Sequence, residues 1–241
     1  MDIGIIGPGR LGRSLGFLFD DVGHRVILVG PGDSQSELGD CDVVLLTVPD
    51  DSIETVAGQL STRGVVLHCS GATDVEPLRP HHPAGSMHPL MTFPGPDISI
   101  PNLKGVHAAV AGDPKALTMA RDLAKILGMI PTIVEGDRRL YHASAVMAGN
   151  FATVIFAQAA TILEKAEIKP SLAREMLAPL AKQSISNATA NPRDSLTGPV
   201  ARGDTAIINA HRSALQEAGL ADLLTLYDNL SHWARELKNS A

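Results

Sequence analysis

The chain has few aromatic side chains and no block of basic residues. Its 241 residues include five Phe, two Tyr and one Trp, so few rings are available to stack on nucleic-acid bases. Acidic residues outnumber basic ones, 26 to 20, which gives a formal net charge of −6. A mildly acidic chain without clustered Lys and Arg lacks the cations that neutralise phosphates. We therefore expect no nucleic-acid partner.

Cysteine is also scarce, since the chain contains only Cys41 and Cys69. Two cysteines cannot form a disulfide framework, and they suit a reducing compartment. The chain begins with the strand-like residues Met1-Asp2-Ile3-Gly4 rather than with the basic and apolar segments of a signal peptide. With 44% hydrophobic and 19% charged residues, the composition is that of a soluble globular protein, and we expect it in the cytoplasm.

Charged residues are absent between Leu140 and Leu163, a stretch long enough to cross a bilayer. The stretch nevertheless contains polar side chains, among them His142, Asn150 and Gln158, and many alanines. This polarity favours a helix buried in protein over one in lipid. We therefore expect no membrane partner, and interpret the stretch as the central helix of a second domain, packed at a subunit interface.

Strand-like and helix-like segments alternate over the first 135 residues. Apolar runs without polar alternation are typical of strands that helices cover on both faces. Asp113-Pro114 is a helix start signal between two of these runs. The alternation predicts an α/β fold with a Rossmann-like, doubly wound sheet, while the Pro- and His-rich segment Pro77–Pro101 predicts a loop. The apolar runs are residues 3–6, 25–29, 42–48, 64–69, 106–111 and 130–134.

After Glu135 the pattern becomes helical and no segment is strand-like. We expect helices over 137–165, from Pro170 to about Ala190, from Asp204 onward, and over an apolar stripe from Leu220 to Leu237. A turn-rich break separates the second from the third. The sequence thus predicts a dinucleotide-binding domain over 1–135 and an all-helical domain for substrate and dimerisation over 136–241.

Gly7-Pro8-Gly9-Arg10-Leu11-Gly12 fits the G-x-G-x-x-G pattern between a predicted strand and a predicted helix. Such glycines permit a tight turn, a close approach of backbone to pyrophosphate, and contact between helix and strand. The amide groups at the helix start would then face the phosphates. A glycine-rich turn that binds nothing is the alternative, and the position of the pattern favours nucleotide binding.

No acid directly follows the second predicted strand. NAD-binding proteins usually carry Asp or Glu there for the ribose hydroxyls, whereas here Gly30-Pro31-Gly32 precede Asp33. This favours NADP, leaves NAD possible, and makes Ser34, Arg10 or Arg13 possible phosphate contacts. The segment from Val29 to Asp42 is too short for a regular helix and strand, which predicts a shortened adenosine side of the pocket.

Residues after other strands should also border the cofactor, because ligands of such sheets bind at the carboxyl ends of the strands. We expect the backbone of Val48-Pro49 to contact it, and Asp50-Asp51-Ser52 to cap a helix. Ser70 should lie near the nicotinamide. Neighbouring Cys69 is better explained as a small buried thiol than as a nucleophile.

Several histidines and one arginine are candidate site residues. His81, His82 and His88 cluster, but without a nearby Cys or Glu they predict no metal site. His88 could donate a hydrogen bond to a substrate carbonyl, act as a general acid, or be a buried structural histidine. The remaining candidates are His142 and Asn150 on one helix face, Arg202 as a carboxylate or phosphate clamp or a solvated side chain, and His211 after the expected N-cap Asp204.

Together these residues resemble a Rossmann-like oxidoreductase family with a helical C-terminal domain of unknown function, in the 6-phosphogluconate dehydrogenase-like superfamily. Relatives include ketopantoate reductase, pyrroline-carboxylate reductase, prephenate dehydrogenase and deazaflavin-dependent NADP reductases. The resemblance spans essentially the whole chain and implies a nicotinamide oxidoreductase that dimerises through its helices. The most specific segments are Met87-His88-Pro89-Leu90-Met91-Thr92-Phe93, Tyr141-His142-Ala143 with Asn150, Leu196-Thr197-Gly198-Pro199, and Arg202-Gly203-Asp204 with His211.

The sequence therefore predicts hydride transfer between a nicotinamide cofactor and a small polar carbonyl or imine, in a cleft between the domains. His88 and Asn150 would polarise the substrate, with His142, Arg202 and His211 beside it. The alternative is a non-catalytic nucleotide-sensing or scaffold protein that keeps the fold. It is favoured by Met147, which stands where several relatives carry a lysine, and by the shortened segment after Val29.

Overall fold

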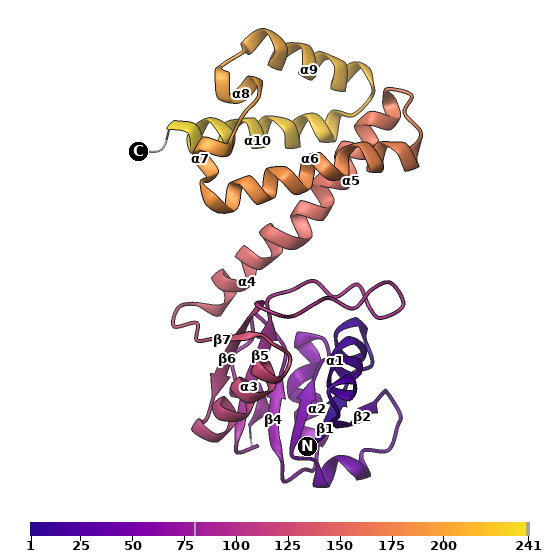
Figure 1. Ribbon diagram of the computed structural model, residues 1–241, viewed down its shortest axis with the longest axis vertical. Coiled ribbons are helices and arrows are strands. Elements are labelled where there is room, and N and C mark those ends of the chain that lie inside the picture. Colours follow the sequence, from indigo (N-terminus) through magenta and orange to yellow (C-terminus); the bar gives the residue numbers. More distant parts are fainter. Residues whose placement is uncertain (80, 240–241) are drawn as a thin grey trace. The chain divides into compact units, whose positions relative to one another are not determined.

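The computed structural model describes residues 1–79 and 81–239, which form two compact units, Met1–Gly149 and Asn150–Ala241 (Figure 1). The boundary predicted from the sequence followed residue 135, where strands give way to helices. In the structure the last strand ends at Thr132 and helix α4 (Arg138–Val146) follows. Helix α4 belongs to the first unit. There the guanidinium of Arg138, its first residue, donates a hydrogen bond to the carbonyl oxygen of Ser70.

A seven-stranded sheet in the order β2-β1-β3-β4-β5-β6-β7 forms the centre of the first unit. Neighbouring strands pair in parallel, except that β5 and β6 are antiparallel. Strands β2 and β3 lie on opposite sides of β1, so the switch point of the winding is at the carboxyl end of β1. This confirms the predicted doubly wound fold. The strands are β1 (Asp2–Ile6), β2 (Arg25–Val29), β3 (Val43–Leu46), β4 (Val65–His68), β5 (Ala84–Pro89), β6 (His107–Gly112) and β7 (Ile130–Thr132).

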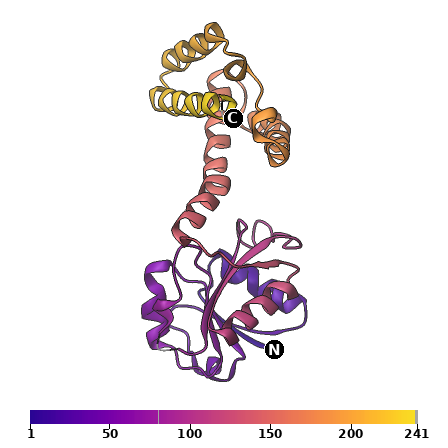
Figure 2. The same ribbon diagram turned by 90° about the vertical axis from the view of Figure 1, so that its left-hand side faces the viewer.

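Helices cover both faces of the sheet (Figure 2). Because successive strand residues point to opposite faces, Val43 and Leu45 join a core with α1 (Arg10–Asp21) and α3 (Pro114–Ile126). Their neighbours Val44 and Leu46 join a second core with α2 (Ile53–Gln59). The apolar runs predicted from the sequence are therefore strands buried on both faces. Short 3-10 turns at Ser36–Asp40, Asp50–Ser52 and Glu76–Leu78 connect the elements.

The prediction of a loop over Pro77–Pro101 is wrong for Ala84–Pro89, which form β5 between β4 and β6. The strand carries small residues because its neighbours are close: a Cβ on Gly85 would lie 2.5 Å from the carbonyl oxygen of Ala111. After β5 the chain does form a long loop, which runs past α1 (Figure 1). The ion pair between Arg13 and Asp97, at 2.7 Å, fastens this loop to α1.

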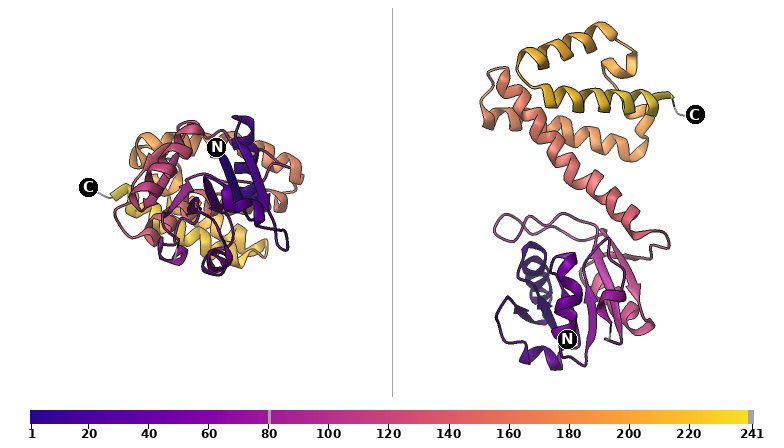
Figure 3. Two further views of the ribbon diagram at one scale, coloured as in Figure 1. Left: turned by 90° about the horizontal axis from the view of Figure 1, so that it is seen from below. Right: turned by 180° about the vertical axis from the view of Figure 1, so that it is seen from behind.

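The second unit is helical, as predicted, and its helices are seen from another side in Figure 3. Helix α6 packs against α5, while α10 packs against α8 and α9. Two short helices, α7 and α8, occupy the break that the sequence predicted. The predicted cap also forms, since the carboxylate of Asp204 accepts a hydrogen bond from the amide of Ile207 at 3.2 Å. The helices are α5 (Ala152–Lys165), α6 (Pro170–Ala190), α7 (Pro192–Ser195), α8 (Pro199–Arg202), α9 (Thr205–Glu217) and α10 (Ala221–Asn239).

A π-helical turn, Met147–Phe151, joins α4 to α5, so that residues 138–165 are helical throughout. In the described part of the chain this is the one helix whose length and composition would allow a membrane span, which is weak evidence for one. Only 6% of its most apolar window is buried. The single chain therefore leaves this helix largely exposed, and its burial at a subunit interface stays a prediction. Apolar side chains such as Phe151, Val154 and Ile155 are exposed on it.

Candidate functional site at the carboxyl edge of the sheet

The glycine-rich turn after β1 is held in a fixed shape by backbone contacts. Gly7 has a φ of +108°, which other residues rarely adopt, and a Cβ on Gly12 would lie 2.1 Å from the carbonyl oxygen of Gly7. The hydroxyl of Thr47, at the end of β3, donates to that same oxygen at 2.7 Å. Two of the three glycines are thus required by the packing of the turn against α1 and β3.

The third glycine leaves open space at the start of α1. Among the described residues no atom lies within 4 Å of a Cβ placed on Gly9. Gly9 is the N-cap residue of α1, and no side chain caps this helix. The first amides of the helix therefore point outward with the positive end of its dipole, which is the arrangement that binds phosphate groups. These residues fit the pyrophosphate of a dinucleotide, with Pro8, Arg10 and Leu11 beside it.

The turn after β2 places the carboxylate of Asp33 at the end of that strand. Asp33 accepts a hydrogen bond from the amide of Gly30 at 2.7 Å, and a Cβ on Gly30 would lie 3.3 Å from the ring of Pro8. The carboxylate of Asp33 is thus near the glycine-rich turn, although no acid directly follows Val29 in the chain. Ser34 lies in the next turn, where its hydroxyl bonds that of Ser36 at 2.9 Å.

A cavity of about 220 Å³ lies beyond the carboxyl ends of the strands, beside the first turn of α1. Three of the residues that line it were predicted to border the cofactor, and two were predicted to be catalytic. All of them belong to the first unit. The cavity therefore brings together Leu11, Val48, Ser70, His88 and His142, and Asp50 also lines it.

Asp50 does not cap a helix, contrary to the prediction for Asp50-Asp51-Ser52. No side chain caps α2 or the turn before it. Instead the carboxylate of Asp50 accepts hydrogen bonds from the hydroxyls of Ser70 at 2.7 Å and Thr73 at 3.1 Å. The hydroxyl of Ser70 in turn accepts from the amide of Thr73 at 3.0 Å. These bonds join the residues after β3 to those after β4 and fix one wall of the cavity.

His68 stabilises the same wall of the cavity. This side chain at the end of β4 has no exposed surface, and its ring bonds the amide of Ser70 at 3.2 Å and the carbonyl of Asp74 at 3.0 Å. Since the amide can only donate, Nδ1 accepts and Nε2 carries the proton. Burial lowers the pKa of His68 to about 4. His68 is therefore a neutral structural residue.

His88 is held between two aromatic residues of α4. Its Nδ1 lies 2.9 Å from the hydroxyl of Tyr141, and its ring meets that of His142 edge to face at 5.9 Å. A Cβ on Gly71 would lie 2.9 Å from Nε2 of His88, so this edge of the ring faces the cavity wall. Burial, followed by the charges of His142 and Arg138, lowers the pKa of His88 to about 4. At neutral pH the imidazole is therefore uncharged, and one ring nitrogen carries a hydrogen that it can donate.

Arg138 is buried beside this group without a carboxylate partner. The residue is only 8% exposed, and one guanidinium nitrogen donates to the carbonyl oxygen of Ser70 at 2.9 Å. Within the described part of the chain its Nε has no hydrogen-bond partner. Burial lowers the pKa of Arg138, as expected for a charge taken out of water. The charge of Asp74 opposes this shift.

His81 and His82 lie apart from this group, whereas Cys69 lines the cavity. His81 bonds the carbonyl of Ala57 at 2.8 Å and His82 lies 3.3 Å from Asp113, so the clustered histidines have separate partners. Among residues 1–79 and 81–239, no group of three His, Cys, Asp or Glu side chains could hold a metal ion. Cys69 is buried, as predicted, and burial raises the pKa of its thiol to about 12.

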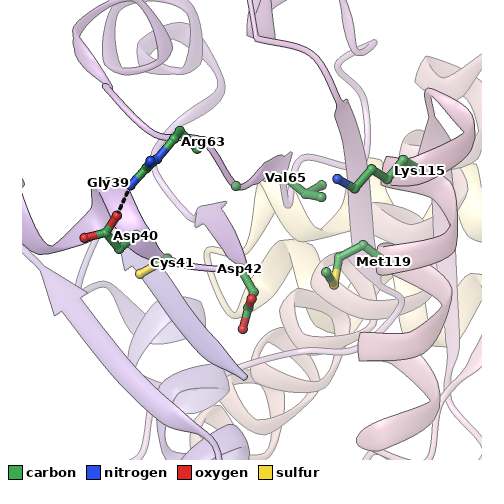
Figure 4. Close-up of a pocket in the computed structure, with 9 residues that line it drawn as sticks. Gly39, Asp40, Cys41, Asp42, Arg63, Val65, Lys115 and Met119 are labelled. Carbon is green, nitrogen blue, oxygen red and sulfur yellow. Dashed lines mark hydrogen bonds and ion pairs between the residues drawn. The ribbon is translucent and has the colours of Figure 1, made fainter.

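A second cavity, of about 350 Å³, opens at the opposite edge of the sheet, where β3 and β4 begin (Figure 4). Asp40 and Arg63 form an ion pair on one side of it, and Lys115 extends toward Val65 from the other. None of the predicted site residues lines this cavity. Ligands of doubly wound sheets bind at the carboxyl ends of the strands, so the cavity lined by Leu11, Ser70 and His88 is the candidate site.

Three predicted catalytic residues belong to the second unit. Asn150 lies in the π-helical turn, Arg202 ends α8, and His211 on α9 bonds the hydroxyl of Tyr227 at 2.9 Å. Their roles stay predictions.

Tyr141 and Arg138 were not assigned roles from the sequence, although Tyr141 stands directly before the predicted residue His142. A signal was present: both lie on α4, and their spacing of three residues places them on one face of a helix.

Comparison with solved structures supports the fold over the whole chain. A protein from Bacteroides fragilis named as a candidate NADP oxidoreductase superposes with a TM-score of 0.83 and 20% identity, over 98% of both chains. The 1-pyrroline-5-carboxylate reductase of Streptococcus pyogenes gives 0.67 and 19% over 98% of both chains. A reductive aminase from Aspergillus terreus, in complex with NADPH and ethyl levulinate, gives 0.66 and 14% over 97% of this chain and 94% of that one.

No curated protein matches the sequence. The family described as a domain of unknown function, DUF2520, matches residues 106–233. This range covers more than half of the chain, from β6 to the last helix. The protein therefore combines a Rossmann-like domain with a helical C-terminal domain, and it belongs to the DUF2520 family.

Proposed function

We propose that the protein is an NAD(P)-dependent oxidoreductase that transfers a hydride between a nicotinamide cofactor and a small polar substrate with a carbonyl or imine group. The single observation that carries the proposal is the cavity at the carboxyl edge of the sheet. There, a neutral histidine and the uncapped start of α1 border the same space: Leu11 of α1 and His88 both line it. The structures named above as reductases of carbonyl or imine compounds have the same fold.

Each part of the site has a separate task in this reaction. The amides after Gly9 bind the pyrophosphate, and Val48 and Pro49 border the nucleotide. The bound cofactor supplies the hydride. His88 donates a hydrogen bond to the substrate and so polarises the bond that is reduced. The predicted contacts of Asn150, His142, Arg202 and His211 with the substrate are part of the proposal.

A thermal-shift panel of NADPH, NADH, ATP and AMP tests cofactor binding. A ligand at 100 times its dissociation constant adds about 2.7 kcal/mol to the free energy of unfolding, which raises the melting temperature by several degrees. We expect a dinucleotide to stabilise the protein more than either mononucleotide. If neither dinucleotide raises the melting temperature, the proposed function is wrong. Dinucleotide binding without turnover of any carbonyl or imine would instead favour a nucleotide-sensing protein.

We further propose that two copies of the chain associate through the helical unit. Large apolar side chains are exposed on α6, among them Met176, Leu180 and Ile185, in addition to those on α5. Removing apolar surface from water is worth about 25 cal/mol per Å², so a face of this kind favours a partner surface of similar character. A second copy supplies such a surface at the same concentration as the first.

A further inference from the structure

Tyr141 and His88 form a hydrogen-bonded pair at the edge of the cavity. The Tyr141 hydroxyl and Nδ1 of His88 are 2.9 Å apart, and the two rings meet at 86°. Nε2 of His88 lies against Gly71, which also lines the cavity, so a neutral ring that accepts from Tyr141 at Nδ1 would carry the Nε2 hydrogen that we propose it donates to the substrate. In this tautomer the hydroxyl of Tyr141 and the substrate are linked through a single imidazole.

Arg138 lies one helical turn before Tyr141 and places a buried positive charge next to the pair. Burial raises the pKa of Tyr141, and the charge of Arg138 opposes this rise. The pKa of His88 is lowered by the charges of His142, Arg138 and His68. The charge of Asp50 raises this pKa, but by less than Arg138 lowers it. The charges that face the pair thus disfavour an imidazolium, and Arg138 favours a tyrosinate against the larger opposing effect of burial.

We propose that Tyr141 is the proton donor of the reaction, that its proton passes through His88 to the oxygen of a carbonyl substrate, and that Arg138 stabilises the resulting tyrosinate. This inference rests on the proposed function and adds the proton source and the substrate class. Hydride adds to the carbonyl carbon, and the π electrons move to the oxygen. As this oxygen takes the proton from Nε2, Nδ1 takes the hydroxyl proton of Tyr141. The nicotinamide is oxidised, the carbonyl is reduced to an alcohol, and a solvent proton restores the pair.

The proton moves from Tyr141 toward the substrate because the substrate oxygen becomes the stronger base. An alkoxide is a far stronger base than a tyrosinate, because the tyrosine hydroxyl has a pKa near 10. A neutral imidazole cannot give up its only hydrogen alone without becoming an anion. Taking a second proton from Tyr141 at Nδ1 removes this difficulty. The charge that forms at Tyr141 is then stabilised by the guanidinium of Arg138, whose own charge is partly offset by Asp74 and whose Nε has no hydrogen-bond partner among the described residues.

The same charge favours a carbonyl over an imine. A protonated imine carries a positive charge at the reacting group, and a buried guanidinium nearby opposes its binding. Asp50 has the opposite effect, but its carboxylate is exposed and already accepts two hydroxyl hydrogen bonds. Exposed charges are screened more strongly than buried ones. The substrate class that fits best is therefore a neutral aldehyde or ketone.

The first test needs no substrate. In the variant Tyr227→Phe, Tyr141 is the remaining tyrosine, and its ionisation can be followed by ultraviolet absorbance against pH. We expect Arg138→Met in this background to raise the Tyr141 pKa further, and Arg138→Lys to leave it near its starting value. Arg139→Met is the matched control, since Arg139 is exposed and paired with Asp137. An unchanged Tyr141 pKa in Arg138→Met overturns the proposal, and so does an unchanged Tyr141 pKa in His88→Ala.

The second test measures oxidation of NADPH or NADH with two sets of probes, simple aldehydes and ketones including ethyl levulinate, and cyclic imines. We expect turnover of a carbonyl probe, with kcat at least about 100-fold lower in Tyr141→Phe and dinucleotide affinity unchanged. Arg139→Met should keep its kcat within about threefold. Turnover restricted to imines, or a kcat in Tyr141→Phe near that of the wild type, overturns this inference while leaving hydride transfer intact. Absence of dinucleotide binding would contradict the proposed function instead.

Discussion

His68 is a residue whose burial makes stability depend on pH. Its pKa is lowered to about 4 in the fold, against an ordinary value near 6.5, and His88 behaves in the same way. Between these two values the unfolded chain binds more protons than the folded one, so stability rises with pH. The stabilisation is complete above pH 6.5 and is lost as the pH falls toward 4.

We expect the melting temperature of the wild-type protein to fall across this range, by the equivalent of up to about 3 kcal/mol per histidine. His68→Leu should melt lower at pH 7, because the Ser70 amide and the Asp74 carbonyl lose their partner, and its melting temperature should vary less with pH. Calorimetry at several pH values measures both effects. His107→Gln, a change at an exposed histidine, is the control. An equally steep pH dependence in His68→Leu would contradict the assignment.

We expect Asp33 to influence which form of the cofactor the proposed site accepts. Its carboxylate lies at the tip of β2, where it can accept a hydrogen bond from a ribose hydroxyl and would repel a 2′-phosphate. We expect Asp33→Ser to raise the affinity for NADPH relative to NADH by about tenfold or more. Titration calorimetry with both cofactors gives the ratio, and Asp21→Ser removes an exposed acid at the far end of α1 as a control. A ratio that stays the same would show that Asp33 does not contact the ribose.

Sequence alone located part of this site at the level of residues. Ser70 and His88 could be predicted because they lie where strands end, and the glycines because their spacing has a steric meaning. The bond between His88 and Tyr141 could not, because it joins residues far apart in the chain. The burial of Arg138, whose Nε has no hydrogen-bond partner among the described residues, is likewise a property of its surroundings. The position of the Asp33 carboxylate could not be predicted, because the fold of the turn after Gly30, rather than sequence distance, sets where it lies.

At the scale of elements, the junction of β1 and α1 can be tested by comparing substitutions at two of its glycines, Gly9 and Gly12. A Cβ on Gly9 meets no described atom within 4 Å, whereas one on Gly12 would lie 2.1 Å from the Gly7 carbonyl oxygen. Gly9→Val should therefore fold with a melting temperature close to the wild-type value and lose dinucleotide binding. Gly12→Val should lower the melting temperature, because α1 must move away from the turn. Unchanged dinucleotide affinity in Gly9→Val, by calorimetry, would mean that the turn is only structural.

The strands and helices with a continuous apolar run could be predicted from the sequence, whereas strand β5 could not. Its sequence, Ala84-Gly85-Ser86-Met87-His88-Pro89, lacks the branched residues of the other strands, and it follows a segment rich in Pro and His. Its place in the sheet depends on close packing against β6 and α3, to which sequence pattern is insensitive. The apolar pattern of α5 and α6 predicted helices correctly. It also suggested burial, which the single chain does not provide.

At the scale of the whole molecule, the chain joins a Rossmann-like unit with a complete core to a helical unit whose apolar faces are exposed. The sheet is covered on both sides, and its strands contribute to two buried clusters. In the helical unit, by contrast, Ala160, Ala173 and Leu215 are the hydrophobic residues that are buried, among those that the structure describes. A partner surface that covered these apolar faces would add to the stability of a unit with so small a core.

This contrast leads to a prediction about assembly. Leu180 and Ile185 on α6 are 64% and 61% exposed, and in a dimer they would be removed from water. We expect the wild-type protein to be a dimer by light scattering at micromolar concentration, and the double variant Leu180→Glu, Ile185→Glu to be a monomer, because burying two carboxylates in an apolar contact is unfavourable. Lys182→Glu, which adds negative charge on the same helix, is the control and should stay dimeric. The first unit should still bind the dinucleotide in the monomeric variant, because its core and its glycine-rich turn involve no residue of α6. A monomeric wild type would contradict the proposed association and leave the exposed faces of α5 and α6 to a different partner.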